Sequence, residues 1–234
     1  MWYSSIMTDK FYQGQGLTSR GVFCEKLTIP ALFHNLLWAP SKLFVWFFLR
    51  LEVETEADLE KLSGPLIVAS NHTCWADSFM IISVFRFNAK VFPIHYAVLK
   101  KLYYFPLSFP FLWLSGAFPV RRKVGLEESL KVPIKIIHKG GVVGIFPEGK
   151  REWKEGLSRP KRGVAYLAFK TGTKILPVRI IIPVKNMTFS GVLLRRYKTK
   201  IKIGKPFYLP SKEIKVIEDY NQPANYVMNR IHQL

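Results

Sequence analysis

Short apolar runs alternate along the chain with segments whose apolar residues recur at helical spacing. We predict strands at residues 66–69, 91–98, 142–146, 175–184 and 200–203. We predict helices at residues 77–84, 127–138 and 163–170, with a break or kink at Pro133, and a last helix with Pro223 in its first turn. Strands that alternate with helices predict one α/β domain with a mostly parallel central sheet flanked by helices.

The segment 27–50 is unusually rich in large aromatic side chains. It is almost long enough to span a bilayer, but Pro40 and Lys42 interrupt its centre. We therefore predict two short helices, a hairpin lying in the membrane interface. The alternative is a hydrophobic hairpin packed on the protein's own core. Residues 1–26 are mixed and polar and predict a loosely held arm without a cleavable signal peptide, which leaves 51–234 as the main domain.

Two further segments are defined by their charge. Residues 103–120 carry no charge, and three prolines exclude a straight transmembrane helix. They predict an apolar surface or groove wall, with a core helix as the alternative. Residues 52–60 hold five carboxylates and predict a solvated surface.

The chain has 234 residues, 49% of them hydrophobic, and a formal net charge of +19. Between Glu155 and Glu213 there is no carboxylate, although the segment holds fourteen Lys or Arg residues. Such a field attracts polyanions, which are nucleic acid, an anionic bilayer or an acidic carrier protein. Cys24 and Cys74 are too few for a disulfide framework or a metal site, so a reducing, cytosol-facing location is expected.

The segment 70–77 carries an imidazole and a carboxylate five positions apart, at His72 and Asp77. This spacing does not place both on one face of a helix. The pair can meet if His72 lies on the turn after the strand and Asp77 in the first turn of the next helix. The carboxylate would then orient the ring and leave Nε2 free to act as a general base. The alternative is a helix-capping histidine with a surface carboxylate.

The segment 144–151 leaves a strand and turns on Pro147 and Gly149. It resembles part of a phosphate loop, but Arg151 stands where a hydroxyl should hold Mg²⁺, and Glu148 would lie among the phosphates. A turn that binds a phosphorylated ligand through Glu148 and Arg151 is more coherent. No Gly-x-Ser-x-Gly elbow accompanies His72, so the nucleophile is expected to be a hydroxyl of the substrate.

Five short blocks in order resemble the glycerolipid acyltransferase family, typified by 1-acyl-sn-glycerol-3-phosphate acyltransferases, over roughly residues 60–205. The blocks are His72-x4-Asp77, Lys100 with Leu102 and Pro106, Gly116-x-Phe118-x-x-Arg121, Phe146-Pro147-Glu148-Gly149-x-Arg151, and Ile175-Leu176-Pro177-Val178. The resemblance implies that His72 is the base and Asp77 its orienting partner. It further implies substrate binding by Lys100, Arg121 and Arg151 at the acceptor's phosphate and by the Glu148-Gly149 turn at the glycerol.

The implied reaction moves a fatty acyl group from acyl-CoA or acyl carrier protein to lysophosphatidic acid. No cofactor and no metal is required. The implied partners are an anionic phospholipid membrane, the lysophospholipid and the acyl carrier, not nucleic acid, and the implied location is the cytoplasmic face of a membrane. Lys101, Val120 and Lys150 depart from the family pattern and make the site more positive. The alternatives are therefore another lysolipid acceptor or a non-catalytic basic protein that binds lipid.

Overall fold

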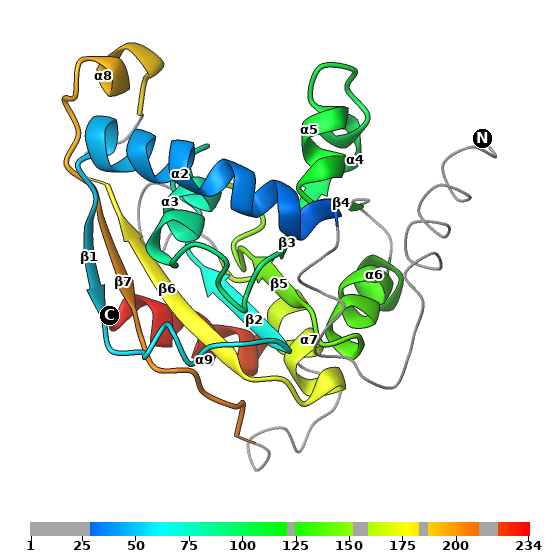
Figure 1. Cartoon of the computed structure of the whole chain (residues 1–234). Coiled ribbons are helices and arrows are strands. Elements are labelled where there is room, and N and C mark those ends of the chain that lie inside the picture. Colours follow the sequence, from blue (N-terminus) through cyan, green and yellow to red (C-terminus); the bar gives the residue numbers. More distant parts are fainter. Residues whose placement is uncertain (1–28, 121–124, 152–158, 183–186, 211–219) are drawn as a thin grey trace.

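Seven strands form one sheet in the order β1-β7-β6-β2-β5-β3-β4, as the computed structural model of the chain shows (Figure 1). The structure describes residues 29–120, 125–151, 159–182, 187–210 and 220–234. The strands are β1 (Glu52–Thr55), β2 (Leu66–Ser70), β3 (Ile94–Leu99), β4 (Phe118–Val120), β5 (Val142–Ile145), β6 (Ile175–Ile181) and β7 (Lys200–Ile203). Among neighbouring strands only β6 and β7 pair antiparallel, so the predicted mostly parallel α/β sheet is confirmed.

Helices cover both faces of the sheet. In Figure 1, α2 and α3 lie on one side and α7 and α9 on the other. The helices are α2 (Ile29–Leu49), α3 (Asp77–Val84), α4 (Lys100–Tyr103), α5 (Phe109–Leu114), α6 (Leu126–His138), α7 (Gly163–Thr171), α8 (Phe189–Leu193) and α9 (Asn221–His232). Three predicted helices are confirmed. They are α3, which begins at Asp77, α7, which ends just before Gly172, and α9, which has Pro223 in its first turn.

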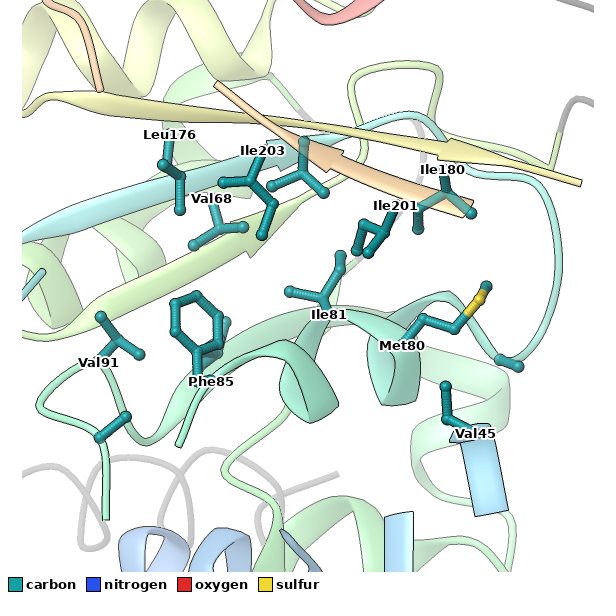
Figure 2. Packing of buried hydrophobic residues seen from close by; sticks show 14 of the residues in the cluster. Val45, Val68, Met80, Ile81, Phe85, Val91, Leu176, Ile180, Ile201 and Ile203 are labelled. Atoms are coloured by element: carbon teal, nitrogen blue, oxygen red, sulfur yellow. The ribbon is translucent and has the colours of Figure 1, made fainter. Parts of the chain in front are cut away.

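Alternation along β2 divides its side chains between two cores. Leu66 and Val68 join the cluster under α3, while Ile67 and Ala69 join the one under α6, α7 and α9. Figure 2 shows Val68 and its neighbours on β6 and β7 facing Ile81 of α3 and Phe85, which directly follows this helix. The central strand is therefore buried on both faces, which explains why it reads as a continuous apolar run.

Residues 29–49 form one helix, so the predicted break into a two-helix hairpin is wrong for these residues. The buried side chains of α2 include His34, Ser41, Val45 and Leu49, at intervals that keep one stripe on the core across the proline. Pro40 lies on the exposed side, so its ring does not disturb this packing. Burial of a continuous stripe outweighs the hydrogen bond that the proline removes. No helix among the described residues combines the length and apolar character needed to cross a bilayer.

Other boundaries also depart from expectation. Helix α6 continues through Pro133. The acidic segment is solvated, as predicted, yet Glu52–Thr55 is a strand that pairs with β7, with Glu52 and Glu54 in ion pairs with Lys198 and Lys200. Cross-strand pairs of opposite charge stabilise an exposed edge, a signal that burial patterns do not carry. The predicted arm, residues 1–26, lies outside the described residues.

Candidate active site

Three parallel strands bring the predicted site residues to one edge of the sheet. His72 follows β2, the turn with Glu148 follows β5, and Lys100 follows β3. These strands are neighbours in register, with Ala69 opposite Ile145. The carboxyl ends of parallel strands are the usual place for ligands in α/β sheets.

His72 and Asp77 form the predicted pair. His72 Nδ1 lies 2.6 Å from Asp77 Oδ2. The imidazole is 25% exposed, whereas the Asp77 side chain is 1% exposed. Asp77 is the first residue of α3, where the helix dipole favours a negative charge. The ring donates its Nδ1 proton to the carboxylate, so Nε2 is the atom that can accept a proton from a substrate.

The turn between the two residues wraps around the carboxylate. Thr73 donates to Asp77 from its backbone N–H at 2.7 Å and from its hydroxyl at 2.8 Å. Cys74 donates from its N–H at 3.0 Å and from its thiol at 3.2 Å. Burial and the neighbouring Asp77 raise the pKa of the Cys74 thiol, so this cysteine stays protonated and is no nucleophile. The short loop thus fixes the position of the Asp77 carboxyl group beside the histidine.

Asn71 anchors the same turn to the sheet. Its side-chain amide donates to Ile180 O at 2.8 Å and accepts from Ile180 N–H at 2.7 Å. The side chain therefore replaces a backbone pairing with β6 just where β2 ends. We did not predict this role. A polar residue between a buried strand and the histidine of the predicted pair is the signal that indicates it.

Glu148 connects the turn after β5 to the turn after β2. It is buried, and its Oε2 accepts the backbone N–H of His72 at 2.8 Å. Gly149 follows with φ +67°, a left-handed conformation that disfavours other residues, and its N–H donates to Phe146 O. The carboxylate therefore helps to hold the backbone of His72, a role that the sequence did not reveal.

Aromatic rings support the imidazole from the side. The His72 ring stacks on Phe146 with centroids 4.3 Å apart and planes 19° apart. Phe146 in turn stacks on Tyr96, at 5.7 Å and 17°. Tyr96 lies over Gly144, where an added Cβ would come 2.2 Å from Tyr96 Cε1. The absent side chain at Gly144 makes room for this stack of three rings.

Cations surround the exposed side of the Glu148 turn. Lys150 and Arg151 are exposed directly after it. The stem of Lys161 passes beside Gly149, and its backbone N–H donates to Pro147 O at 2.6 Å. Lys161, which we did not predict, belongs to a basic run over residues 159–162. Among the described residues, no group of His, Cys, Asp and Glu is placed to hold a metal ion.

A family model described as "Acyltransferase" matches residues 50–181, more than half of the chain. This chain belongs to the acyltransferase family. The 1-acyl-sn-glycerol-3-phosphate acyltransferase of Bacillus subtilis (strain 168) is 30% identical over 194 residues, 79% of this chain and 91% of the relative. The chloroplastic LPAT1 1-acyl-sn-glycerol-3-phosphate acyltransferase of Arabidopsis thaliana is 25% identical, covering 75% of this chain and 49% of its own length. The chain thus spans about half the length of the plant relative.

The fold of this acyltransferase is shared with a solved structure, the 1-acyl-sn-glycerophosphate (LPA) acyltransferase PlsC from Thermotoga maritima. The match has a TM-score of 0.62 at 18% identity and covers 99% of this chain and 88% of that chain. The family match and the named relatives together show that the chain is an enzyme that transfers acyl groups.

The acyltransferase structure joins some of the predicted site residues directly. His72, Asp77, Glu148 and Gly149 form one connected cluster. Arg151 and Lys100 are exposed at the same edge of the sheet, and the Lys100 ammonium lies over the Tyr104 ring, 5.8 Å from its centroid. Arg121 lies outside the described residues.

Proposed function

We propose that this acyltransferase transfers a fatty acyl group from an acyl thioester to the free hydroxyl of 1-acyl-sn-glycerol-3-phosphate. The donor is acyl-CoA or acyl carrier protein. The observation that carries the proposal is the contact of 2.6 Å between His72 and Asp77, with the imidazole partly exposed and the carboxylate buried. The names of the relatives support the acceptor.

In the proposed mechanism His72 acts as a general base. Nε2 removes the proton of the acceptor hydroxyl while its oxygen attacks the thioester carbonyl carbon. A C–O bond forms, the C–S bond breaks, and the imidazolium, stabilised by Asp77, returns the proton to the thiolate. Because the nucleophile is the acceptor's hydroxyl, the protein needs no nucleophile of its own.

The acceptor's phosphate is proposed to bind at the basic turn. Arg151 would provide a planar fork for two phosphate oxygens, with Lys100 and Arg121 contributing further positive charge. Glu148 and Gly149 would position the glycerol. The exposed cations Lys150 and Lys161 also favour an anionic headgroup, but charge of this kind suits several lysophospholipids.

The acceptor and donor are amphiphiles, so we propose that the enzyme works at the cytoplasmic face of a membrane. The exposed aromatic and aliphatic side chains of α2, among them Trp46, Phe47 and Leu36, support this location. Binding both substrates at one interface would raise their effective concentration at the base.

The test is acyl transfer by the purified chain, followed by mass spectrometry of the products. We expect His72→Ala to lower kcat by about 10²- to 10⁴-fold. His138→Ala is the matched control, because His138 is exposed at the end of α6 and should leave the rate unchanged. A panel of lysolipid acceptors, each offered with acyl-CoA and with acyl carrier protein, identifies the substrates. Normal transfer by folded His72→Ala protein would contradict the mechanism.

A further inference from the structure

Exposed large hydrophobic side chains gather on one part of the described structure. They lie on α2, on the segment 99–111 that contains α4 and the start of α5, on α8 with the following Leu194, and at Trp75 and Phe87. The other exposed large hydrophobic residues in the described ranges are Val53, Phe169 and Tyr208. In Figure 1, α8 lies beside the C-terminal end of α2, and α4 and α5 project beside its N-terminal end.

Helix α2 is apolar on more of its surface than the described residues bury. Its buried stripe faces the core, while Leu32, Leu36, Leu43 and Trp46 are exposed on another stripe with helical spacing. A helix that is apolar around most of its circumference needs a second apolar environment. The core, as far as the structure describes the chain, provides only one of these two apolar environments.

The connection between α4 and α5 is an apolar tip. Tyr104, Phe105, Pro106 and Leu107 are all exposed, and Leu107 is 85% exposed. The tip is held beside α2 by an edge-to-face contact between Phe111 and Phe33, with centroids 5.5 Å apart. A run of four exposed apolar residues is costly in water and indicates a covering partner.

Helix α8 continues the same surface at the other end of α2. Phe189, Leu193 and Leu194 are exposed. The next residue, Arg195, places its guanidinium 4.3 Å from the centroid of Phe47 and donates to Phe47 O at 3.0 Å. The contact fixes α8 against α2, so the two apolar stretches lie side by side.

The charges on these elements are all positive. The sequence has no carboxylate at residues 26–51, 78–126 or 156–212, which include α2, α4, α5 and α8. Lys42 lies over the Trp38 ring on α2, and Lys101, Arg195 and Arg196 are exposed. Apolar side chains bordered by cations complement an anionic bilayer, where the rings and aliphatic chains enter the interface and the cations meet lipid phosphates.

We propose that the α4–α5 tip and α8 bind an anionic phospholipid bilayer, on either side of α2, as one continuous membrane-binding surface. This inference rests on the proposed function of the enzyme at a membrane. It adds two elements from distant parts of the sequence to the membrane contact of α2. Contacts by all three parts of this surface would fix the orientation of the domain on the bilayer, which a single helix cannot do.

The test is binding of the full chain to vesicles of phosphatidylglycerol and phosphatidylcholine. We expect Phe105→Ser/Leu107→Ser and Leu193→Ser/Leu194→Ser each to lower vesicle affinity at least about tenfold. The matched control is Phe169→Ser/Tyr208→Ser, exposed hydrophobic residues away from this surface, which should bind like the parent. Lys101→Gln and Arg196→Gln should each lower affinity for anionic vesicles about fivefold, and added salt should weaken binding by the parent.

The inference would be overturned if the tip double variant and the α8 double variant both bound vesicles like the parent. It would also be overturned if the control double variant lost as much affinity, or if the parent did not bind vesicles. If the tip and α8 double variants bound vesicles normally but no longer bound an acidic carrier protein, the inference would also be overturned, because the surface would then be a protein-binding site. Acyl transfer to lysophosphatidic acid in detergent micelles tests the proposed function separately. We expect both apolar variants to retain it, whereas His72→Ala should bind vesicles normally and form product about 10²- to 10⁴-fold more slowly.

Discussion

Asp77→Asn is the sharpest test of the candidate active site, because it changes one buried oxygen to an amide and preserves shape. The carboxylate receives donors from His72, Thr73 and Cys74 on two oxygens. An asparagine offers one acceptor oxygen and a group that only donates. At least two of these buried donors would therefore lose their acceptor.

The expected magnitudes follow from this count of donors. Each buried donor left without an acceptor costs about 1–3 kcal/mol, so we expect Asp77→Asn to lower the free energy of unfolding by about 2–6 kcal/mol. The amide would also donate to His72 Nδ1 and favour the tautomer with a proton on Nε2, which cannot act as a base. By analogy with the buried aspartate of serine proteases, we expect kcat to fall about 10³- to 10⁴-fold.

Urea unfolding and steady-state acyl transfer measure the two effects. Asp58→Asn is the control, because Asp58 is an exposed carboxylate paired with Lys61 and its replacement should change stability by less than about 0.5 kcal/mol. The double variant His72→Ala/Asp77→Asn should be about as inactive as His72→Ala, since the two residues act as a unit. A folded Asp77→Asn protein with a rate within tenfold of the parent would refute the assignment of Asp77.

Two further predictions concern the surroundings of the site. Gly144→Ala should cost about 1–3 kcal/mol of stability and lower kcat up to about 10²-fold, because its methyl group would displace Tyr96 and with it the rings that support His72. Urea unfolding and acyl-transfer assays measure the two effects. Gly163→Ala is the control that should remain active, because the atoms nearest to its added Cβ would be 3.9 Å away. Burial lowers the pKa of His95 to about 4, so the unfolded chain takes up the proton first, and stability should fall by about 1.4 kcal/mol per pH unit as the pH drops from 6.5 towards 4. In urea titrations, His95→Gln should show a shallower fall, and an equal slope would contradict the prediction.

The central part of the site could be predicted because its geometry is local. His72 and Asp77 are five positions apart, and the end of a strand followed by the start of a helix is sufficient to bring them together. The strand itself was predictable because burial on both faces produces a continuous apolar run. The parallel pair β1 and β7 at the edge was predictable only in part, since β7 alternates while β1 is exposed throughout.

The contacts that support the proposed base His72 could not be predicted, because they depend on which strands become neighbours. Phe146 and Glu148 reach His72 only because β5 pairs with β2. Tyr96 reaches Phe146 only because β3 pairs with β5. Asn71 meets Ile180 through the pairing of β2 with β6. The order of strands is a tertiary property, and local patterns do not determine it. The continuous helix α2 was missed for a related reason: the local cost of Pro40 is outweighed by packing along its whole length.

The turn that carries His72, the proposed base, also contacts the proposed membrane surface. The ring centroid of Trp75, three residues after His72, lies 6.2 Å from the ring centroid of Phe44 on α2. Asp77 follows two residues later, so this contact with α2 lies within the short turn that joins His72 to Asp77. Substitutions in α2 can therefore disturb lipid binding and the geometry of the base together. The α4–α5 tip and α8 reach the same surface without contacting this loop among the described aromatic and hydrogen-bond contacts. Substitutions there can separate membrane binding from catalysis, whereas deletion of α2 cannot.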